Sequence, residues 1–386
     1  MSEIKVNSIK GVSASVAALS INNTDGTCTA NITNNLSNKN LIINGAFLIS
    51  QRGTSSTVDG FGTVDRFQNV HTNTDEAPTQ AQADVASGTT PYTSGFRKSF
   101  KITNGNQTSG AGATDELFIR TRLEAQDIAN SGWNYTSSSS YITLSFWVKS
   151  SVAQNFFGRL TTNDGTAQSY PFETGSLTAD TWTKITKTIS GNSNLQFDNN
   201  NDKGLAIEWA LFRGTDQTGT VTLNQWAASN SSARTPDQTS TWYTTNDATF
   251  EITGVQLEVG SFSSDFQFRS FAEELALCNR YFQRVPKSPS DGYSGICNGR
   301  VNNSTTCEQL LNFSEMRATP TLASSGNLRV LQSTGAKSVT ATSLIHGSRT
   351  TIFFSASVAS GLTAGDSAQL TMNNDTTAHI TLSAEL

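Results

Sequence analysis

Aromatic residues in polar loops are the first feature of this sequence that could do chemistry. Trp133 and Tyr135 lie in "SGWNYTSSSS", Trp226 lies in "NQWAASNSS", and Trp242 and Tyr243 lie in "STWYTTND". Sugars present C–H faces that stack on such rings, while Asn and Ser side chains pair with sugar hydroxyl groups. The five rings are therefore candidate glycan contacts. Packing against the sheet edge or a sister subunit is the favoured interpretation for each ring, and sugar stacking is the sharper hypothesis.

Patterns typical of catalysis are missing from the sequence. The three histidines, His71, His346 and His379, lie in unrelated segments. The chain contains no G-x-S-x-G, H-E-x-x-H, P-loop or G-x-G-x-x-G motif. We therefore predict that the protein is not an enzyme and has no catalytic residues.

Carboxylates on the expected strands leave two alternatives open. Asp115, Glu116, Glu208 and Glu258 could supply the acid pair of a glycosidase, although no motif orients them. Oxygen ligands near Asn44 or Glu258 could hold a structural calcium ion, which nothing further in the sequence supports. We predict no metal site and no cofactor.

Composition narrows the classes of partner. Charged residues make up 15% of the 386, the net charge is −5, and Lys and Arg are scattered without a basic run. A phosphate-binding surface and nucleic-acid binding are therefore not expected. No apolar run is long enough for membrane insertion, and the first residues do not resemble a secretory signal. The four cysteines lie far apart in the sequence: Cys28, Cys278, Cys297 and Cys307. This spacing favours buried free thiols, and a disulfide between Cys297 and Cys307 is the alternative.

Short alternating strands dominate the middle of the chain. In "YITLSFWVKS", every second residue from Ile142 to Val148 is apolar and points to one face of the expected strand, whereas Trp147 points to the other face. Many such segments, separated by turn signals and without intervening helices, predict an antiparallel jelly-roll β-sandwich over 41–269. In the last strand, the alternation of apolar residues shifts by one position after Ile252. A β-bulge at Thr253–Gly254 is therefore expected, because one extra residue would keep the apolar side chains on the same face.

One helix is expected in this all-β chain, over about 271–284. Ser270 and Glu273 form a capping box at its start, and Pro286 ends it. One apolar stripe would pack on the sandwich. The second stripe, formed by Leu277 and Tyr281, would pack on a neighbouring chain and is our candidate trimer interface.

Four regions follow from these patterns. Residues 1–40 read as an extended N-terminal arm that attaches to another structure, and 41–269 form the jelly-roll domain. Residues 270–285 form the linking helix. Residues 286–386 form a smaller C-terminal β domain, which would be a tip or a trimer clamp.

Several stretches together resemble a known family. They are "NLIINGAFLISQRGTS", "VDRFQNV", "YITLSFWVKSS", "TWTKITKTIS" and "FEITGVQLEVGSFSSDFQFRSFAEELALCNRYF". They resemble the tail-fibre or receptor-binding structural proteins of tailed bacteriophages. The strand order of 41–269 is also similar to carbohydrate-binding jelly rolls. The sequence departs from the phage pattern at Ile49–Ser50 and at Phe67, where a Trp is usual, and both departures affect packing or groove residues.

The resemblance implies a homotrimeric fibre or spike on the virion surface. Such a protein assembles in the host bacterial cytoplasm, attaches through its N-terminal arm to a tail or capsid protein, and binds a host cell-surface glycan. Two alternatives stay open. One is a head-decoration or connector protein without a receptor, and the other is a polysaccharide depolymerase.

Overall fold

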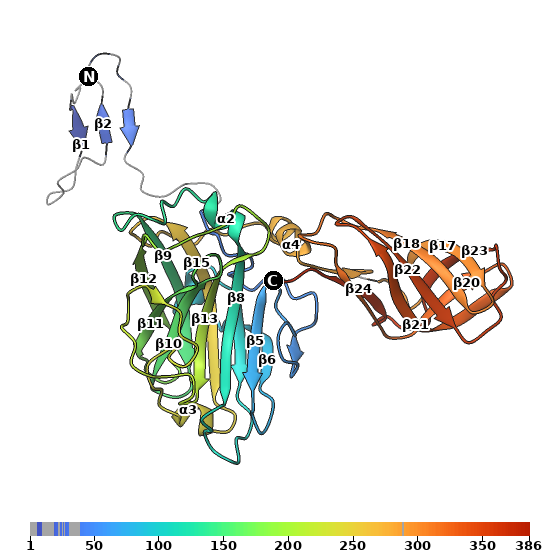
Figure 1. Cartoon of the computed structure of the whole chain (residues 1–386), viewed down its shortest axis with the longest axis horizontal. Helices are drawn as coiled ribbons and strands as arrows, with labels where there is room; N and C mark the ends of the chain where they lie inside the picture. The colour runs from blue at the N-terminus through green and yellow to red at the C-terminus, as the bar shows by residue number, and fades with distance from the viewer. Residues whose placement is uncertain are drawn as a thin grey trace.

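The structure is a computed structural model, and it describes residues 6–9, 19–21, 24, 26, 28–30, 39–287 and 289–386. Figure 1 shows a large β-sandwich and a smaller β unit side by side, with a short helix and the C-terminus between them. The chain is all-β, as predicted, with a jelly-roll sandwich and a second, smaller β unit. Most of the predicted N-terminal arm lies outside the described residues.

Two antiparallel sheets of six strands form the sandwich. The first sheet contains, in spatial order, β14 (Ala227–Ala228), β11 (Gln168–Ser176), β10 (Asn155–Thr162), β13 (Lys203–Arg213), β8 (Glu116–Glu124) and β5 (Phe67–Thr72). The second contains β12 (Thr183–Ser190), β9 (Tyr141–Ser150), β15 (Thr249–Val259), β7 (Lys98–Thr103), β6 (Thr79–Asp84) and β4 (Ser55–Ser56). We call them the β13 sheet and the β15 sheet.

Alternating side chains build the core between these sheets. The apolar residues of β9 follow the predicted alternation, because all four lie in the core between the sheets, while Trp147 lies outside it and is only half-buried: Ile142, Leu144, Phe146 and Val148. Across the core, Trp209 of β13 lies 5.6 Å from Phe146 of β9, in an edge-to-face contact between ring centroids. The predicted segment 41–50 is not a strand, although it packs on β15 through a bond from Leu41 N–H to Leu257 O of 2.9 Å.

Short elements complete the first part of the chain. The helices are α1 (Thr90–Thr93), α2 (Ala125–Ala129) and α3 (Thr241–Thr244). Three short strands near the N-terminus form a sheet of their own: β1 (Ser8–Ile9), β2 (Leu19–Ile21) and β3 (Cys28–Ala30). No helix in the described part of the chain is both long and apolar enough to span a membrane.

A closed barrel forms most of the second unit. Its strands, in spatial order, are β17 (Gly295–Asn303), β18 (Thr306–Asn312), β22 (Thr351–Val358), β21 (Gly335–Gly347), β20 (Leu328–Gln332) and β23 (Ser367–Met372). Cys297 and Cys307 are buried in it as free thiols, on either side of Gln309. Burial raises the pKa of Cys297 to about 12. The bridge that the sequence left open is therefore not formed.

The predicted helix is shorter than expected. Its start is confirmed, because Ser270 N–H donates to Glu273 and Glu273 N–H donates back to Ser270 Oγ, at 2.8 and 3.3 Å. Helix α4 (Phe271–Asn279) ends before Tyr281. The chain then forms β16 (Phe282–Val285), which pairs with β24 (His379–Ser383) in a sheet completed by β19 (Thr321–Ser325).

Candidate functional site

Two of the five candidate glycan rings are core residues at one end of the sandwich. Trp242 is 0% exposed, and its Nε1–H donates to Thr249 O at 3.0 Å. Tyr243 is also fully buried, stacked on Phe212 at 4.3 Å between ring centroids, with its hydroxyl donating to Asp115 at 3.1 Å. Neither ring offers an open face to a sugar.

The other three candidates pack elsewhere on the sandwich. Trp133 is buried, Tyr135 is half-buried, and both contact Phe197. Trp226 is buried against Tyr170, and its Nε1–H donates to Ser190 O at 2.8 Å. Trp133, Trp226, Trp242 and Tyr243 therefore have the packing role that the sequence favoured, and their buried rings present no stacking platform. Their loops fold back onto the sandwich because a large ring gains free energy when it leaves water.

The bulge in β15 creates a different aromatic site. Pairing with β9 shifts register between Thr253 and Gln256, which confirms the predicted bulge. Gly254 has a φ of +63°, and a Cβ there would lie 2.6 Å from the ring of Phe96. Glycine therefore both permits the backbone conformation and leaves the space in which Phe96 packs.

Around this bulge lies a groove of about 410 Å³ on the outer face of the β15 sheet, which we call the aromatic groove. Its lining residues are Ser94, Phe96, Ser145, Trp147, Lys184, Gly254, Ser264, Asp265, Phe266 and Phe268. The rings of Phe96, Phe266 and Phe268 lie 4.9 to 5.1 Å apart between centroids. Phe268 remains 51% exposed, so part of this cluster faces solvent.

Polar groups surround these rings. Lys184 is exposed and lies directly across from Trp147 in the β12–β9 pairing. Asp265 is also exposed, and its backbone carbonyl accepts a hydrogen bond of 2.6 Å from Lys39 Nζ. Exposed aromatic faces beside a few charged and hydroxyl groups are the chemistry that a sugar ring requires.

The sequence contained only part of the signal for this groove. Trp147 is an apolar residue at a position of its strand that should face away from the core. The shift in apolar alternation near Gly254 marks the bulge. Phe266 and Phe268, in the segment between β15 and α4, were not predicted as site residues. Their contact with Phe96, about 170 residues earlier, depends on the tertiary fold.

The candidate glycosidase carboxylates are held in structural contacts. Glu208 is buried and accepts hydrogen bonds from Arg159 Nε at 2.7 Å and Arg213 Nη2 at 2.6 Å. Burial works against its charged form, but the two guanidinium groups outweigh burial and hold the pKa of Glu208 well below its usual range. Glu208 is therefore not a ready proton donor at neutral pH. Glu116 pairs with Arg234 at 2.8 Å.

The oxygen atoms considered for calcium face hydrogen-bond donors. Glu258 is buried and accepts bonds from Gln256 Nε2 and from the backbone and hydroxyl of Ser264, at 2.6 to 2.8 Å. Asn44 Oδ1 accepts from Ile49 N–H at 3.0 Å. In the described ranges, no three His, Cys, Asp or Glu side chains gather as a metal site.

The candidate trimer-interface residues have different environments. Leu277 of α4 is half-buried and borders an open hollow of about 510 Å³, which Arg269 and Asp127 also line. Tyr281 is buried, and its hydroxyl donates to Glu124 at 2.6 Å. The prediction that Tyr281 contacts another chain was wrong, because its own sandwich fills the space around it.

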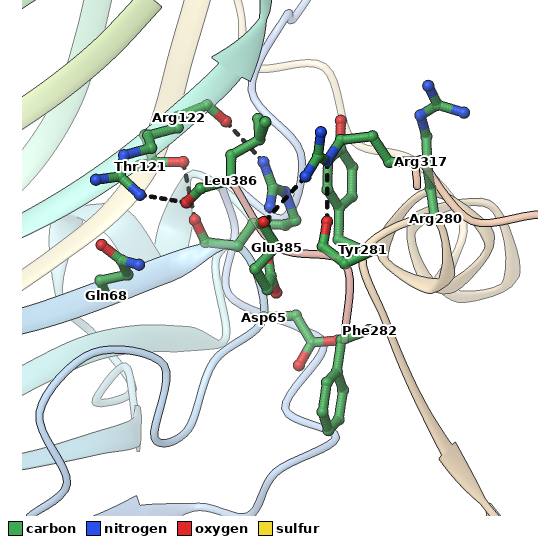
Figure 2. Close-up of polar contacts among 12 residues, drawn as sticks. Asp65, Gln68, Thr121, Arg122, Arg280, Tyr281, Phe282, Arg317, Glu385 and Leu386 are labelled. Carbon is green, nitrogen blue, oxygen red and sulfur yellow. Dashed lines mark hydrogen bonds and ion pairs between the residues drawn. The ribbon is translucent and has the colours of Figure 1, made fainter. Parts of the chain in front are cut away.

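Figure 2 shows the junction around Tyr281, where the sandwich meets the smaller β unit. Arg66 lies 3.4 Å above the Tyr281 ring and forms an ion pair with Glu385. Arg52 pairs with the same carboxylate at 3.0 Å. Arg317, from the smaller unit, donates to Ala384 O and to Asn201 O of the sandwich, at 2.9 and 2.8 Å. Polar contacts thus join the two units through Arg317 and through Ala384 and Glu385, directly after β24.

Comparison with known proteins gives structural similarities only. No family model and no curated protein matches the chain. Solved structures that match include a putative sugar binding protein from Bacteroides thetaiotaomicron VPI-5482, with 13% identity and a TM-score of 0.28 over 57% of this chain and 99% of that one. The N-terminal cellulose-binding domain of Cellulomonas fimi β-1,4-glucanase C matches with 11% identity and a TM-score of 0.27, over 56% and 99%.

A two-domain structure is similar over a longer part of the chain. The CBM22-1–CBM22-2 tandem domain of Paenibacillus barcinonensis Xyn10C has 9% identity and a TM-score of 0.26, over 91% of this chain and 100% of that one. TM-scores of this size carry no functional information. We therefore base the proposed function on the aromatic groove.

Proposed function

We propose that this protein is a non-catalytic glycan-binding protein and that it serves as a homotrimeric tail fibre or spike of a bacteriophage. The aromatic groove carries the glycan part of this proposal. It combines the exposed ring of Phe268 and the half-buried ring of Trp147 with Lys184 and Asp265. The sequence resemblance supports the phage part, including assembly in the bacterial cytoplasm and display on the virion.

Binding at this groove would be weak for one chain. A sugar face on one or two rings contributes roughly 0.5–1.5 kcal/mol beyond its buried area, and the groove is open to solvent. Three chains that engage one cell surface raise the effective concentration at each remaining groove. Trimer formation would therefore turn a weak contact into stable attachment. We propose Leu277 and the hollow beside it as one contact between chains.

The glycan proposal is tested with host capsule or lipopolysaccharide sugar chains and the purified full-length chain. Phe268→Ala and Trp147→Ala should each weaken binding about three- to ten-fold in titration calorimetry, because each removes a stacking face. Trp182→Ala is the matched control. Trp182 is also half-buried and beside β12, but it lies against Lys149, outside the groove.

Two outcomes would reject this proposal. The first is unchanged affinity in both groove variants, and the second is an equal loss in Trp182→Ala. Light scattering of the same samples tests the trimer separately, since a monomeric mass at micromolar concentration would remove the multivalent mechanism. Sugar release from host polysaccharide would instead favour a depolymerase.

A further inference from the structure

A second pocket lies on the outer face of the β13 sheet, on the other side of the sandwich from the aromatic groove. Its volume is about 310 Å³. Ser169 and Pro171 of β11 line it together with the segment 220–234, whose strand β14 pairs with β11. The remaining lining residues are Thr220, Val221, Thr222, Gln225, Ala227, Ala228, Asn230, Ala233 and Arg234. The pocket contains hydroxyl, amide and guanidinium groups but no aromatic ring.

The segment around β14 is fixed beside β11 by hydrogen bonds. Asn224 N–H donates to Pro171 O and Ser229 N–H donates to Ala167 O, both at 2.8 Å. Trp226, between these two points, inserts its ring beside Tyr170 in the core. The loop aromatic that the sequence suggested as a sugar contact therefore holds its neighbours Gln225 and Ala227 at the pocket wall. A pocket held in this way is formed before a ligand arrives.

Ser169 provides the first sign of a ligand. It is 8% exposed, and its Oγ has no hydrogen-bond partner in the part of the chain that the structure describes. A buried hydroxyl without a partner costs free energy, so such groups are usually satisfied. Rotation of the Ser169 side chain towards the pocket would let a ligand hydroxyl supply the missing bond.

Arg234 provides the second sign. Its Nη1 donates to both oxygens of Glu116, at 2.9 and 2.8 Å, and to Gln217 Oε1 at 2.8 Å. Among the described residues, no hydrogen bond engages its Nε or Nη2. These two atoms form one edge of the guanidinium, and such an edge matches the two oxygens of a carboxylate.

The charges around Arg234 also favour an anion. The ion pairs on this face of the sheet join four guanidinium groups to two carboxylates, those of Glu116 and Glu208. The four arginines are Arg120, Arg159, Arg213 and Arg234. Asp59 also acts on Arg120, so these four guanidinium groups face three carboxylates, which leaves an excess of one positive charge.

We propose that this pocket binds a carboxylated sugar residue, such as a uronic acid within an acidic polysaccharide. Arg234 would bind the carboxylate, and Ser169 with the neighbouring Thr and amide side chains would bind the hydroxyls. The inference rests on the proposed glycan-binding function but uses a separate site. Recognition here depends on charge and hydrogen bonds, whereas the aromatic groove depends on stacking.

The test is a titration of the full chain with glucuronic acid, followed by saturation-transfer NMR and calorimetry, with glucose as the neutral control. The wild type should bind glucuronic acid and bind glucose at least ten-fold more weakly. Ser169→Ala should weaken glucuronic acid binding about five-fold by removing one hydrogen bond. Arg234→Lys, which keeps the charge but loses the two-atom edge, should weaken it about ten-fold. Ser232→Ala, a nearby exposed serine outside the pocket lining, should bind as the wild type does.

Failure here is distinguishable from failure of the proposed function. Glucuronic acid binding should persist in Trp147→Ala, whose groove lies on the other sheet. The second site alone would be overturned if the wild type did not bind glucuronic acid. It would also be overturned if Ser169→Ala and Arg234→Lys both bound glucuronic acid as tightly as the wild type does. If wild-type affinity for host polysaccharide were unchanged in the aromatic-groove variants, the proposed function would fall instead.

Discussion

Glu385→Ala should destabilise the junction between the sandwich and the smaller β unit, so that the two units unfold independently. The Glu385 side chain is 7% exposed and pairs with Arg52 and Arg66, whose side chains are 11% and 3% exposed. Removing the carboxylate leaves two largely buried guanidinium groups without their shared counter-ion. Breaking a buried ion pair from one side costs about 3–5 kcal/mol.

The expected loss lies at the lower end of that range. Arg52 keeps a contact with Asp65 at 3.5 Å, and Arg66 keeps its hydrogen bond to Arg122 O and its position over Tyr281. We therefore expect the free energy of unfolding to fall by about 3 kcal/mol. This is a large part of the roughly 5–15 kcal/mol that stabilises most domains.

The distribution of tryptophan provides the assay. All six Trp residues lie between positions 133 and 242, so their fluorescence reports only on the sandwich, whereas far-ultraviolet circular dichroism reports on both units. In urea, the two signals should change together in the wild type and separate in Glu385→Ala, because the junction couples the units.

Glu315→Ala is the matched control. Glu315 pairs with Arg349 at 2.7 Å, but these side chains are 59% and 47% exposed. An exposed pair contributes at most about 1 kcal/mol. In Glu315→Ala, fluorescence and circular dichroism should therefore still change together in urea, as in the wild type. If Glu385→Ala destabilised the protein no more than Glu315→Ala, our account of the junction would be refuted.

Three further predictions concern pH, the bulge and the core aromatics. Burial raises the pKa of Asp65 to about 6 against the opposing effect of Arg52, so the folded state holds this proton more tightly than the unfolded state does. The contribution of Asp65 to stability should therefore rise as pH falls from 7 towards 4, and Asp65→Asn should remove that slope. A difference in unfolding free energy between wild type and variant that does not vary with pH would contradict this. Gly254→Ala should cost about 1–3 kcal/mol through its positive φ, and should weaken polysaccharide binding by displacing Phe96, as calorimetry would show. Trp242→Ala should cost about 3–5 kcal/mol in thermal unfolding, while the folded fraction keeps its affinity for polysaccharide. A stable Trp242→Ala that lost binding would restore the stacking role for this ring.

Local patterns predicted the strands well. The inner face of β9 and the bulge in β15 followed from alternation alone, because side chains on a strand point to opposite faces with a period of two residues. The start of α4 followed from the reciprocal bonds of Ser270 and Glu273, which lie three residues apart. Each of these features depends on residues that are close in the sequence.

Features that depend on distant residues could not be predicted in this way. After Asn279 the chain leaves the helix and pairs at Phe282–Val285 with β24, almost a hundred residues later. Tyr281, just before this strand, is buried against Arg66 and Glu124 of the sandwich. Trp226 and Trp242 are predicted to be loop residues from their local sequence, but the fold buries both rings, and Trp242 lies in the short helix α3. Alternation and capping therefore determined the strand faces and the helix start. Which aromatic rings stay exposed was decided by tertiary packing, because burial depends on what the folded chain brings to each ring.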